Sequence, residues 1–177
     1  MRRAWTSVFV VALGCALGCG SGEAHPPDAG VPDAAPRGQG NEPRGDLAVN
    51  EVGSAVYGSP DYIELVNRGL QAVDLSGWYV TDAADRLDHY YTFPAGTSLA
   101  AGAYLVVWAD DGAAGEGHHA PFELGASDGA YLIGPTGLNA DSFVYLALED
   151  GRTLSRLPDR EGLFFSGTAT PGGANTP

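Results

Sequence analysis

Residues Asp61–Asp82, DYIELVNRGLQAVDLSGWYVTD, decide the fold of this chain. Ile63 and Leu65 alternate with their neighbours, a period of two that is typical of a half-buried β-strand. The Asn-Arg-Gly sequence that follows predicts a reversal, because Asn and Gly tolerate a positive φ. A second apolar pattern then leads to Trp78, which we expect to anchor the core, since an indole buries a large apolar area. No pattern in this stretch is typical of a reaction centre.

The composition of the chain predicts one domain with many turns. Its 177 residues are 44% hydrophobic, which suits one core better than two. Gly (26) and Pro (12) exceed ordinary usage but stay below the range of low-complexity chains. The 22 acidic residues outnumber 9 basic ones, all of them Arg. This balance argues against a nucleic-acid partner, because phosphate binding needs clustered Lys or Arg.

Residues 1–18 have the features of a bacterial lipoprotein signal peptide. An Arg-Arg pair precedes the apolar run Ala4–Leu17, which is too short and too diluted to span a bilayer reliably. The following Ala16-Leu17-Gly18-Cys19 is similar to a lipobox, although such boxes usually begin with Leu. We therefore predict a lipid on Cys19, with Cys15 as the alternative and ordinary secretion as another. After Cys19, Gly-Ser gives no acidic signal for inner-membrane retention, so the prediction is a lipid anchor in the bacterial cell envelope, at the outer membrane.

Residues 19–44 are predicted to be a disordered tether. The segment GSGEAHPPDAGVPDAAPRGQGNEPR is dominated by Pro, Gly, Ala and charged residues, and Val31 is its only branched apolar residue. Such a segment cannot bury enough apolar surface to offset the entropy lost on ordering. A random coil of this length spans on the order of 25–30 Å, enough to hold a domain clear of a membrane.

Residues 45–177 are predicted to form an all-β domain. Short apolar runs alternate with Gly, Pro and Asp turn signals, and no stretch has helical periodicity, a combination typical of a sandwich or barrel. The longest apolar run, Tyr104–Trp108, is expected to be near-central or buried on both faces, and Ala120–Leu124 is an ambiguous edge segment. The predicted strands are Leu47–Val52, Tyr62–Asn67, Ala72–Leu75, Trp78–Thr81, Tyr90–Phe93, Tyr104–Trp108, Tyr131–Ile133, Phe143–Leu148 and Thr153–Arg156.

A series of short motifs runs through residues 46–175. In order they are Asn50-Glu51-Val52, Asp61–Leu65 with Asn67, Val73–Trp78 with Asp82, Phe93–Thr97, Leu99–Val107, Arg156–Asp159 and Thr170–Asn175. In this order they resemble the lamin tail domain family, with Tyr62 at a position where many relatives carry Trp. The resemblance implies an immunoglobulin-like β-sandwich that serves as an interaction module, and it brings no reaction with it. The nuclear role of some members does not carry over, because the chain has no coiled-coil heptads and no basic nuclear-localisation run.

The candidate metal ligands are Asp82, Asp85 and Asp88, spaced D-x-x-D-x-x-D. Calcium takes six to eight oxygen ligands, and such a loop offers three carboxylates and several carbonyls. The spacing is not that of an EF-hand, however, and Arg86 would partly neutralise the group. The alternative is a polar loop that caps strand ends. We expect no cofactor, with calcium as the exception that this spacing allows.

Two other patterns favour structural interpretations. Residues 125–129 match G-x-S-x-G, but a nucleophile elbow needs a helix after Ser127 and a triad His further along, and no His follows His119. Ser127 is therefore interpreted as a turn residue. The neighbouring pair His118-His119 lies in a Gly-rich region, and adjacent residues of an extended chain point to opposite faces. The two imidazoles are not expected to chelate one metal ion.

Glu51 and Glu64 lie within predicted strands, on the sides opposite their apolar neighbours. A buried carboxylate there needs Arg or backbone donors, and Arg68 and Arg156 are the candidate partners. A salt bridge or a solvent-facing position is favoured over acid–base chemistry, because no nucleophile or cofactor motif accompanies the pair.

The leading functional hypothesis is a non-catalytic, envelope-anchored binding or scaffold module that engages a protein or glycan partner. The alternative is a calcium-stabilised surface adhesion module that uses Asp82, Asp85 and Asp88. A hydrolase is the third hypothesis and has the least support.

Overall fold

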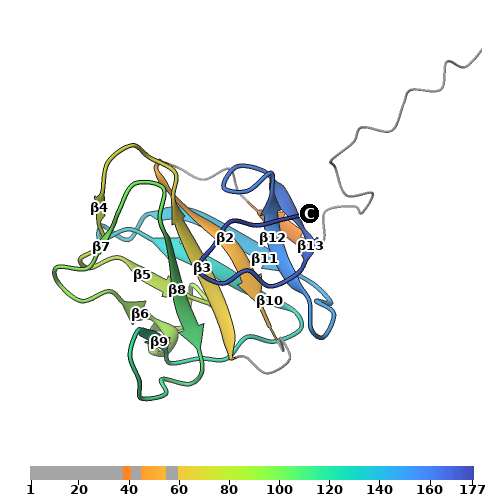
Figure 1. The fold of residues 1–177 in the computed structure, drawn as a ribbon. Helices are drawn as coiled ribbons and strands as arrows, with labels where there is room; N and C mark the ends of the chain where they lie inside the picture. The colour runs from red at the N-terminus through yellow and green to blue at the C-terminus, as the bar shows by residue number, and fades with distance from the viewer. Residues whose placement is uncertain (1–37, 41–44, 55–59) are drawn as a thin grey trace, which may run out of the picture.

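The computed structural model describes residues 38–40, 45–54 and 60–177, which form a two-layered β-sandwich (Figure 1). A six-stranded sheet packs against a five-stranded sheet, and a small two-stranded sheet lies at one end. The predicted all-β, immunoglobulin-like sandwich is therefore confirmed.

The six-stranded sheet has the order β13-β12-β2-β3-β8-β9, and the five-stranded sheet has the order β1-β11-β10-β5-β6. The strands of the larger sheet are β2 (Leu47–Gly53), β3 (Asp61–Asn67), β8 (Tyr104–Ala109), β9 (His118–Ala120), β12 (Thr153–Leu157) and β13 (Leu163–Gly167). Those of the smaller sheet are β1 (Gly38–Gly40), β5 (Tyr79–Thr81), β6 (Tyr91–Thr92), β10 (Asp128–Ile133) and β11 (Asn139–Tyr145). The two-stranded sheet pairs β4 (Val73–Asp74) with β7 (Ser98–Leu99), and a 3-10 helix, η1, spans Leu87–His89. Strand neighbours are antiparallel, except that β9 runs parallel to β8.

The inner faces of the two large sheets share one hydrophobic core. In β3, the side chains of Ile63 and Leu65 lie in this core, and Glu64 between them lies on the outer face, as the period of two predicts. From the opposite sheet, Phe143 stacks on Phe164 of β13, with ring centroids 3.7 Å apart. Trp78 packs against the core just before β5 and is only partly buried.

A buried ion pair also joins the two sheets. Arg156 of β12 bonds Asp141 of β11 at 3.0 Å, and the two side chains are only 3% and 0% exposed. The guanidinium donates to the carbonyl of Val49 as well, and it lies 4.5 Å above the ring of Phe164. Burial raises the pKa of Asp141, and the charge of Arg156 opposes that rise. The pair satisfies its own hydrogen bonds inside the core, which keeps the two layers in register.

A β-bulge in β2 decides which side chains reach the outer face of the six-stranded sheet. The ladder pairs Val49 with Leu65 but Glu51 with Glu64, so β2 carries one extra residue, Asn50, between them. Without the extra residue, Glu51 would share the inward face with Val49. The bulge turns Glu51 outward, beside Glu64.

The structure corrects several strand predictions. β1, β7 and β13 were not predicted, and β10 and β11 begin earlier than expected. β1 lies inside the predicted disordered tether 19–44 and pairs with β11, so that residues 38–40 belong to the sandwich. The run Leu163–Phe165 at the start of β13 is apolar throughout, so it lacks the alternation of polar and apolar residues that identifies a strand. Phe164 packs on the core, and β13 is an edge strand of its sheet. The ambiguous segment Ala120–Leu124 begins in β9, and Tyr104–Trp108 is buried on one face only.

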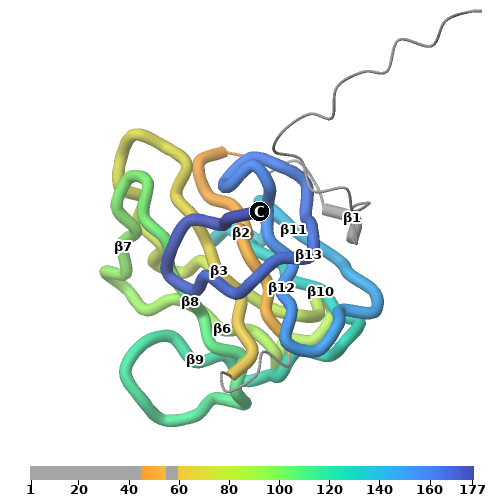
Figure 2. Tube along the Cα trace, turned by 45° about the vertical axis from the view of Figure 1, so that its right-hand side comes forward, coloured from red at the N-terminus to blue at the C-terminus, as the bar shows by residue number. Residues whose placement is uncertain are grey.

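After β13 the chain crosses the outer face of β2 and β3. Both views show this C-terminal segment, drawn in dark blue, running over the two strands (Figures 1 and 2). We call residues 168–175 the C-terminal strap.

Candidate functional site

The C-terminal strap binds the outer face of the six-stranded sheet through backbone amides and the side chains of Thr170 and Asn175. The amide of Thr170 donates to Glu51 Oε2 at 3.0 Å, and the amide of Gly172 donates to Glu64 Oε2 at 2.6 Å. The side chain of Asn175 donates to the carbonyl of Asn50 at the bulge. The strap therefore ties β2 to β3 and removes this face from solvent.

Glu51 and Glu64 are both fully buried beneath the strap. The hydroxyls of Thr153 and Ser155 each donate to Glu51 Oε1 at 2.8 Å, and the hydroxyl of Thr170 donates to Oε2. These donors replace the hydrogen bonds that water molecules would donate to an exposed carboxylate.

Neither of the predicted Arg partners meets this carboxylate pair. Arg156 forms the inter-sheet ion pair with Asp141, and Arg68 donates to the carbonyl of Gly45. The expected salt bridge or solvent-facing position was therefore wrong. A network of hydroxyl and amide donors holds Glu51 and Glu64 instead.

The buried network shifts the protonation of its members. Burial raises the pKa of Glu64 to about 7; the charges of Glu51 and Asp159 add to this rise, and the hydrogen bonds from Asn50 and Gly172 oppose it. Burial also raises the pKa of Tyr62, whose hydroxyl lies beside Glu51 and makes no hydrogen bond of good geometry within the described residues. Paired carboxylates can in principle act as acid and base. Here both are sealed from any substrate, so the pair fastens the strap.

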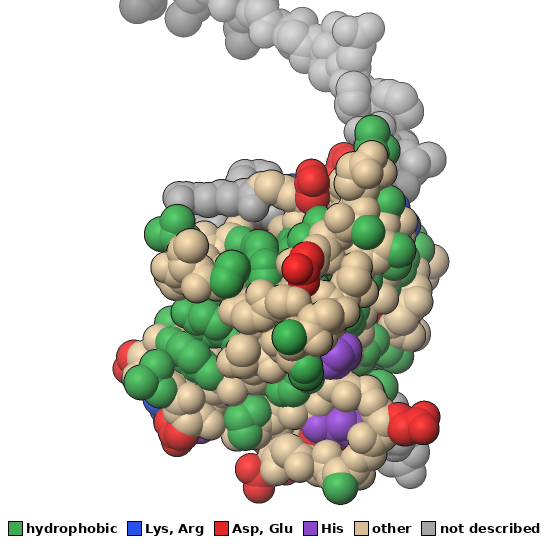
Figure 3. Space-filling view, turned by 90° about the vertical axis from the view of Figure 1, so that its left-hand side faces the viewer, with side chains coloured by type: hydrophobic (Ala, Val, Ile, Leu, Met, Phe, Trp, Pro, Cys, Tyr) green, Lys and Arg blue, Asp and Glu red, His purple; other side chains and the backbone are tan. Residues whose placement is uncertain are grey.

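The surface away from the strap combines hydrophobic and acidic side chains. Figure 3 shows the side of the molecule that carries β4, β5, β6 and β7, where hydrophobic side chains fill much of the middle and single acidic ones lie mainly toward the margins. The full chain carries a net charge of −13, so acidic side chains alone do not mark a site. A binding site must therefore be located by shape as well as by charge.

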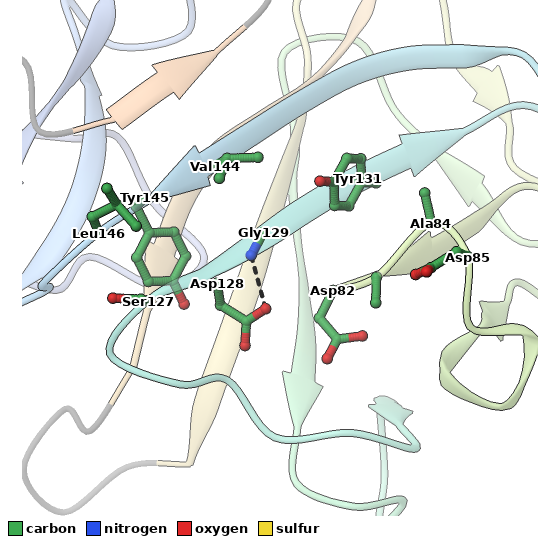
Figure 4. A pocket seen from close by; sticks show the side chains of 11 residues that line it. Asp82, Ala84, Asp85, Ser127, Asp128, Gly129, Tyr131, Val144, Tyr145 and Leu146 are labelled. Atoms are coloured by element: carbon green, nitrogen blue, oxygen red, sulfur yellow. Dashed lines mark hydrogen bonds between the residues drawn. The ribbon is translucent and has the colours of Figure 1, made fainter.

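A groove of about 430 Å³ lies on the outer face of the five-stranded sheet (Figure 4). We call it the sheet groove, and its lining includes Asp82, Asp85, Asp128, Tyr131, Val144 and Leu146. Ala130, Leu132 and Phe143 of the same strands point into the core, so Gly129, Tyr131 and Val144 face outward into the groove. Asp128, which alternates in step with Ala130, lines the groove from the first position of β10. Val144 is 42% exposed and Leu146 is 73% exposed.

The floor of the groove depends on Gly129. A Cβ atom at this position would lie 2.5 Å from Cε2 of Tyr131 and 2.9 Å from the carbonyl oxygen of Asp82. The missing side chain lets the Tyr131 ring lie against the strand. Figure 4 shows the carboxylates of Asp82, Asp85 and Asp128 along one side of the groove, with the aliphatic side chains at the other.

The family model described as Lamin Tail Domain matches residues 41–155, more than half of the chain. The chain belongs to the lamin tail domain family. Among the curated proteins, none matches it. The match stops before β13 and the strap, yet Thr170 and Gly172 bond Glu51 and Glu64 within the matched region, so the strap is part of the same fold.

The three predicted metal ligands of this lamin tail domain have separate surroundings. Asp82 is bound by His89 Nδ1 at 2.7 Å, and Asp88 is bound by Arg86 at 2.8 Å. Asp85 is exposed at the sheet groove. Among the residues that the structure describes, no group of three or more His, Cys, Asp or Glu side chains is placed to hold a metal ion.

The two adjacent histidines diverge, as the sequence predicts. His118 Nδ1 shares a hydrogen bond with the hydroxyl of Tyr91 at 2.8 Å, whereas His119 Nδ1 bonds Asp110 at 2.7 Å. Burial lowers the pKa of His118, and the hydrogen bond to Asp110 raises the pKa of His119. His118 thus joins β9 to β6 of the other sheet, whereas His119 holds the segment that follows β8.

Ser127 lies in the bend before β10, and its hydroxyl accepts a hydrogen bond from the amide of Ala147. A strand follows it instead of the helix that a nucleophile elbow requires. The interpretation of Ser127 as a turn residue agrees with this position.

The predicted signal peptide, residues 19–37 and 41–44 of the predicted tether, and both Cys15 and Cys19 lie outside the described residues. Across residues 38–40, 45–54 and 60–177, no helix has the length and hydrophobicity needed to cross a bilayer.

The sheet groove was missed by the sequence reasoning. The signal was present in Phe143–Leu146, where both alternating sets of side chains are apolar or aromatic. Such a strand buries one set in the core and leaves the other on the outer face. The contributions of Asp128 and Tyr131 depend on how β10 pairs with β5 and β11, which local sequence does not reveal.

Proposed function

We propose that this lamin tail domain is a non-catalytic binding or scaffold module, anchored to the bacterial cell envelope at the outer membrane by a lipid on Cys19. Its partner, a protein or a glycan, docks at the sheet groove. Family membership supports a binding or scaffold role. The signal-peptide pattern of residues 1–18 supports the anchor, and the Pro- and Gly-rich residues 19–44 support a tether that gives the domain reach.

The observation that carries the proposal is the difference between the two outer faces of the sandwich. The C-terminal strap covers the face of β2 and β3. In the part of the chain that the structure describes, Val144 and Leu146 remain exposed on the face of β10 and β11, next to Tyr131. Apolar side chains grouped at a groove mark interaction sites, whereas single exposed apolar residues do not.

Cross-linking in intact envelopes tests the docking face. The native chain is compared with Leu146→Ser, and with Leu70→Ser as a matched control, because Leu70 is 92% exposed in the turn after β3. We expect the native chain and the control to cross-link the same envelope component, and Leu146→Ser to lose most of that product. Equal cross-linking by all three chains would refute the docking face.

Cys19→Ser tests the anchor separately. We expect this chain to leave the membrane fraction, while the native chain stays in it. Retention of Cys19→Ser in the membrane would refute lipid attachment at that residue and would direct attention to Cys15.

A further inference from the structure

The sheet groove is lined by three acidic side chains as well as by apolar ones. Asp82, Asp85 and Asp128 line it beside Tyr131, its lining includes no Arg, and the chain contains no Lys. Resting on the docking face proposed above, we propose that the partner is a protein, and that it docks by an extended segment in which Lys or Arg side chains alternate with hydrophobic ones.

Two of the three carboxylates of the groove, those of Asp85 and Asp128, have no cationic hydrogen-bond partner within the described residues. Asp128 accepts hydrogen bonds from the amides of Gly125 and Gly129, which fix its orientation but do not neutralise it. Asp85 is exposed, and its side chain makes no hydrogen bond or ion pair within the described residues. Asp82 alone has a partner that can be cationic, the imidazole of His89.

Arg86, the basic residue next to Asp85 in the sequence, forms an ion pair outside the groove. Arg86 bonds Asp88 at 2.8 Å, outside the groove lining. The charge of Arg86 also acts on Asp82 and Asp85. A cation brought by the partner competes with Arg86 at Asp85, whereas Asp128 and the ring of Tyr131, whose face attracts Lys and Arg, lie in a lining that includes no Arg.

The apolar side of the groove sets the shape of the partner. Val144 and Leu146 are two residues apart and face the same side, because alternate side chains of an extended chain share a face. If the partner binds as an extended segment along Val144 and Leu146, one set of its alternating side chains faces these two residues. The other set faces the carboxylates of the groove. Anionic glycans and phosphates are repelled by the same carboxylates, so the charge favours a cationic protein segment.

A fluorescein-labelled peptide of Lys-Val repeats is the probe, and fluorescence anisotropy with the purified protein is the measurement. We expect it to bind, a Glu-Val peptide not to bind, and affinity to fall about tenfold between about 50 mM and about 500 mM NaCl. Asp85→Lys is expected to weaken binding about tenfold, since it replaces an attraction by a repulsion. Glu161→Lys is the matched control, with the same charge change at an exposed site in the β12–β13 turn.

The outcomes separate the inference from the proposed docking face. Equal binding of the Glu-Val peptide, salt-independent binding, or equal loss in Asp85→Lys and Glu161→Lys would overturn the cationic inference. So would binding of chitohexaose in place of the Lys-Val peptide, which would point to a neutral glycan. If the peptide does not bind but envelope cross-linking still depends on Leu146, the cationic inference fails and the docking face stands. Thermal melting of each variant confirms that it is folded.

Discussion

Glu64 makes the stability of this domain depend on pH, and Glu64→Gln tests the buried network under the strap. Its carboxyl group is fully buried, and burial raises its pKa from 4.5 to about 7. In the unfolded chain the group is hydrated and loses its proton near the lower value. Between the two values, the folded protein holds a proton that the unfolded chain has released.

The sign and the size of the effect follow from this difference. Because the folded state binds more protons, the free energy of unfolding falls as the pH rises from about 4.5 to about 7, and it levels off above that. One pKa unit corresponds to about 1.4 kcal/mol, so the shift costs about 3 kcal/mol once Glu64 is ionised in both states. Below the lower pKa both states are protonated, and the residue adds no pH dependence.

Urea unfolding at constant ionic strength, from about pH 4 to about pH 8, measures the effect. Gln cannot ionise, so we expect the wild-type free energy of unfolding to fall by about 3 kcal/mol more than that of Glu64→Gln over this range. The amide nitrogen of Gln cannot accept the hydrogen bond from Gly172 or Asn50, which adds a pH-independent offset, so the difference in slope is the test. Asp141, whose pKa is also raised, titrates in both proteins and cancels.

Glu123→Gln is the matched control, because Glu123 is exposed. Its pH profile should follow the wild type. Parallel profiles for the wild type and Glu64→Gln would refute the reasoning, since they would mean that Glu64 titrates alike in the folded and unfolded chains.

Three more perturbations test other parts of the molecule. Asp141→Asn leaves the buried guanidinium of Arg156 without its counter-charge, and urea titration should show a loss of about 3 kcal/mol; a loss under about 1 kcal/mol would contradict the role of the ion pair. Gly129→Ala places a Cβ 2.5 Å from the Tyr131 ring, so we expect a loss of about 1–3 kcal/mol and a changed near-ultraviolet circular dichroism spectrum, and an unchanged spectrum would contradict the packing described for the groove floor. Excess calcium should leave the melting temperature within about 1 °C of its value in EDTA, because Asp82 already has a protein partner, and a rise of several degrees would favour the calcium-stabilised adhesion alternative.

Local sequence was enough to predict the sandwich and most of its strands. The period of two at Ile63 and Leu65 placed these residues in the core, and the motif order from Asn50 to Asn175 indicated the family that the match over residues 41–155 then showed. The divergence of His118 and His119 also followed from strand geometry. These predictions succeeded because each depends on neighbours in the sequence or on the order of short motifs.

The surroundings of Glu51 and Glu64 could not be predicted in the same way. Alternation with Ile63 and Leu65 placed Glu64 on the outer face, and alternation with Val52 placed Glu51 there, although Glu51 reaches that face only because of the bulge after Val49. An outer face is not the same as a solvent-exposed one. Their burial depends on the bulge at Asn50 and on the strap, whose donors Thr170 and Gly172 lie more than a hundred residues further along the chain. Such contacts leave no periodic signal, and the choice of Arg68 and Arg156 as partners failed for that reason.

The strap also explains why the two outer faces of the sandwich differ in chemistry. A face that the chain covers itself can carry carboxylates, provided that the covering segment brings donors, as Thr170 and Gly172 do for Glu51 and Glu64. A face that binds a separate molecule has that molecule's hydrogen-bond donors only while the complex exists. Its carboxylates must therefore be solvated, or bonded to donors of the domain itself, when the face is free. Asp85 and Asp128 meet that condition at the sheet groove, since one is exposed and the other is held by backbone amides. Carboxylates therefore hold the strap on one side of the sandwich and, in the function proposed above, bind a partner on the other.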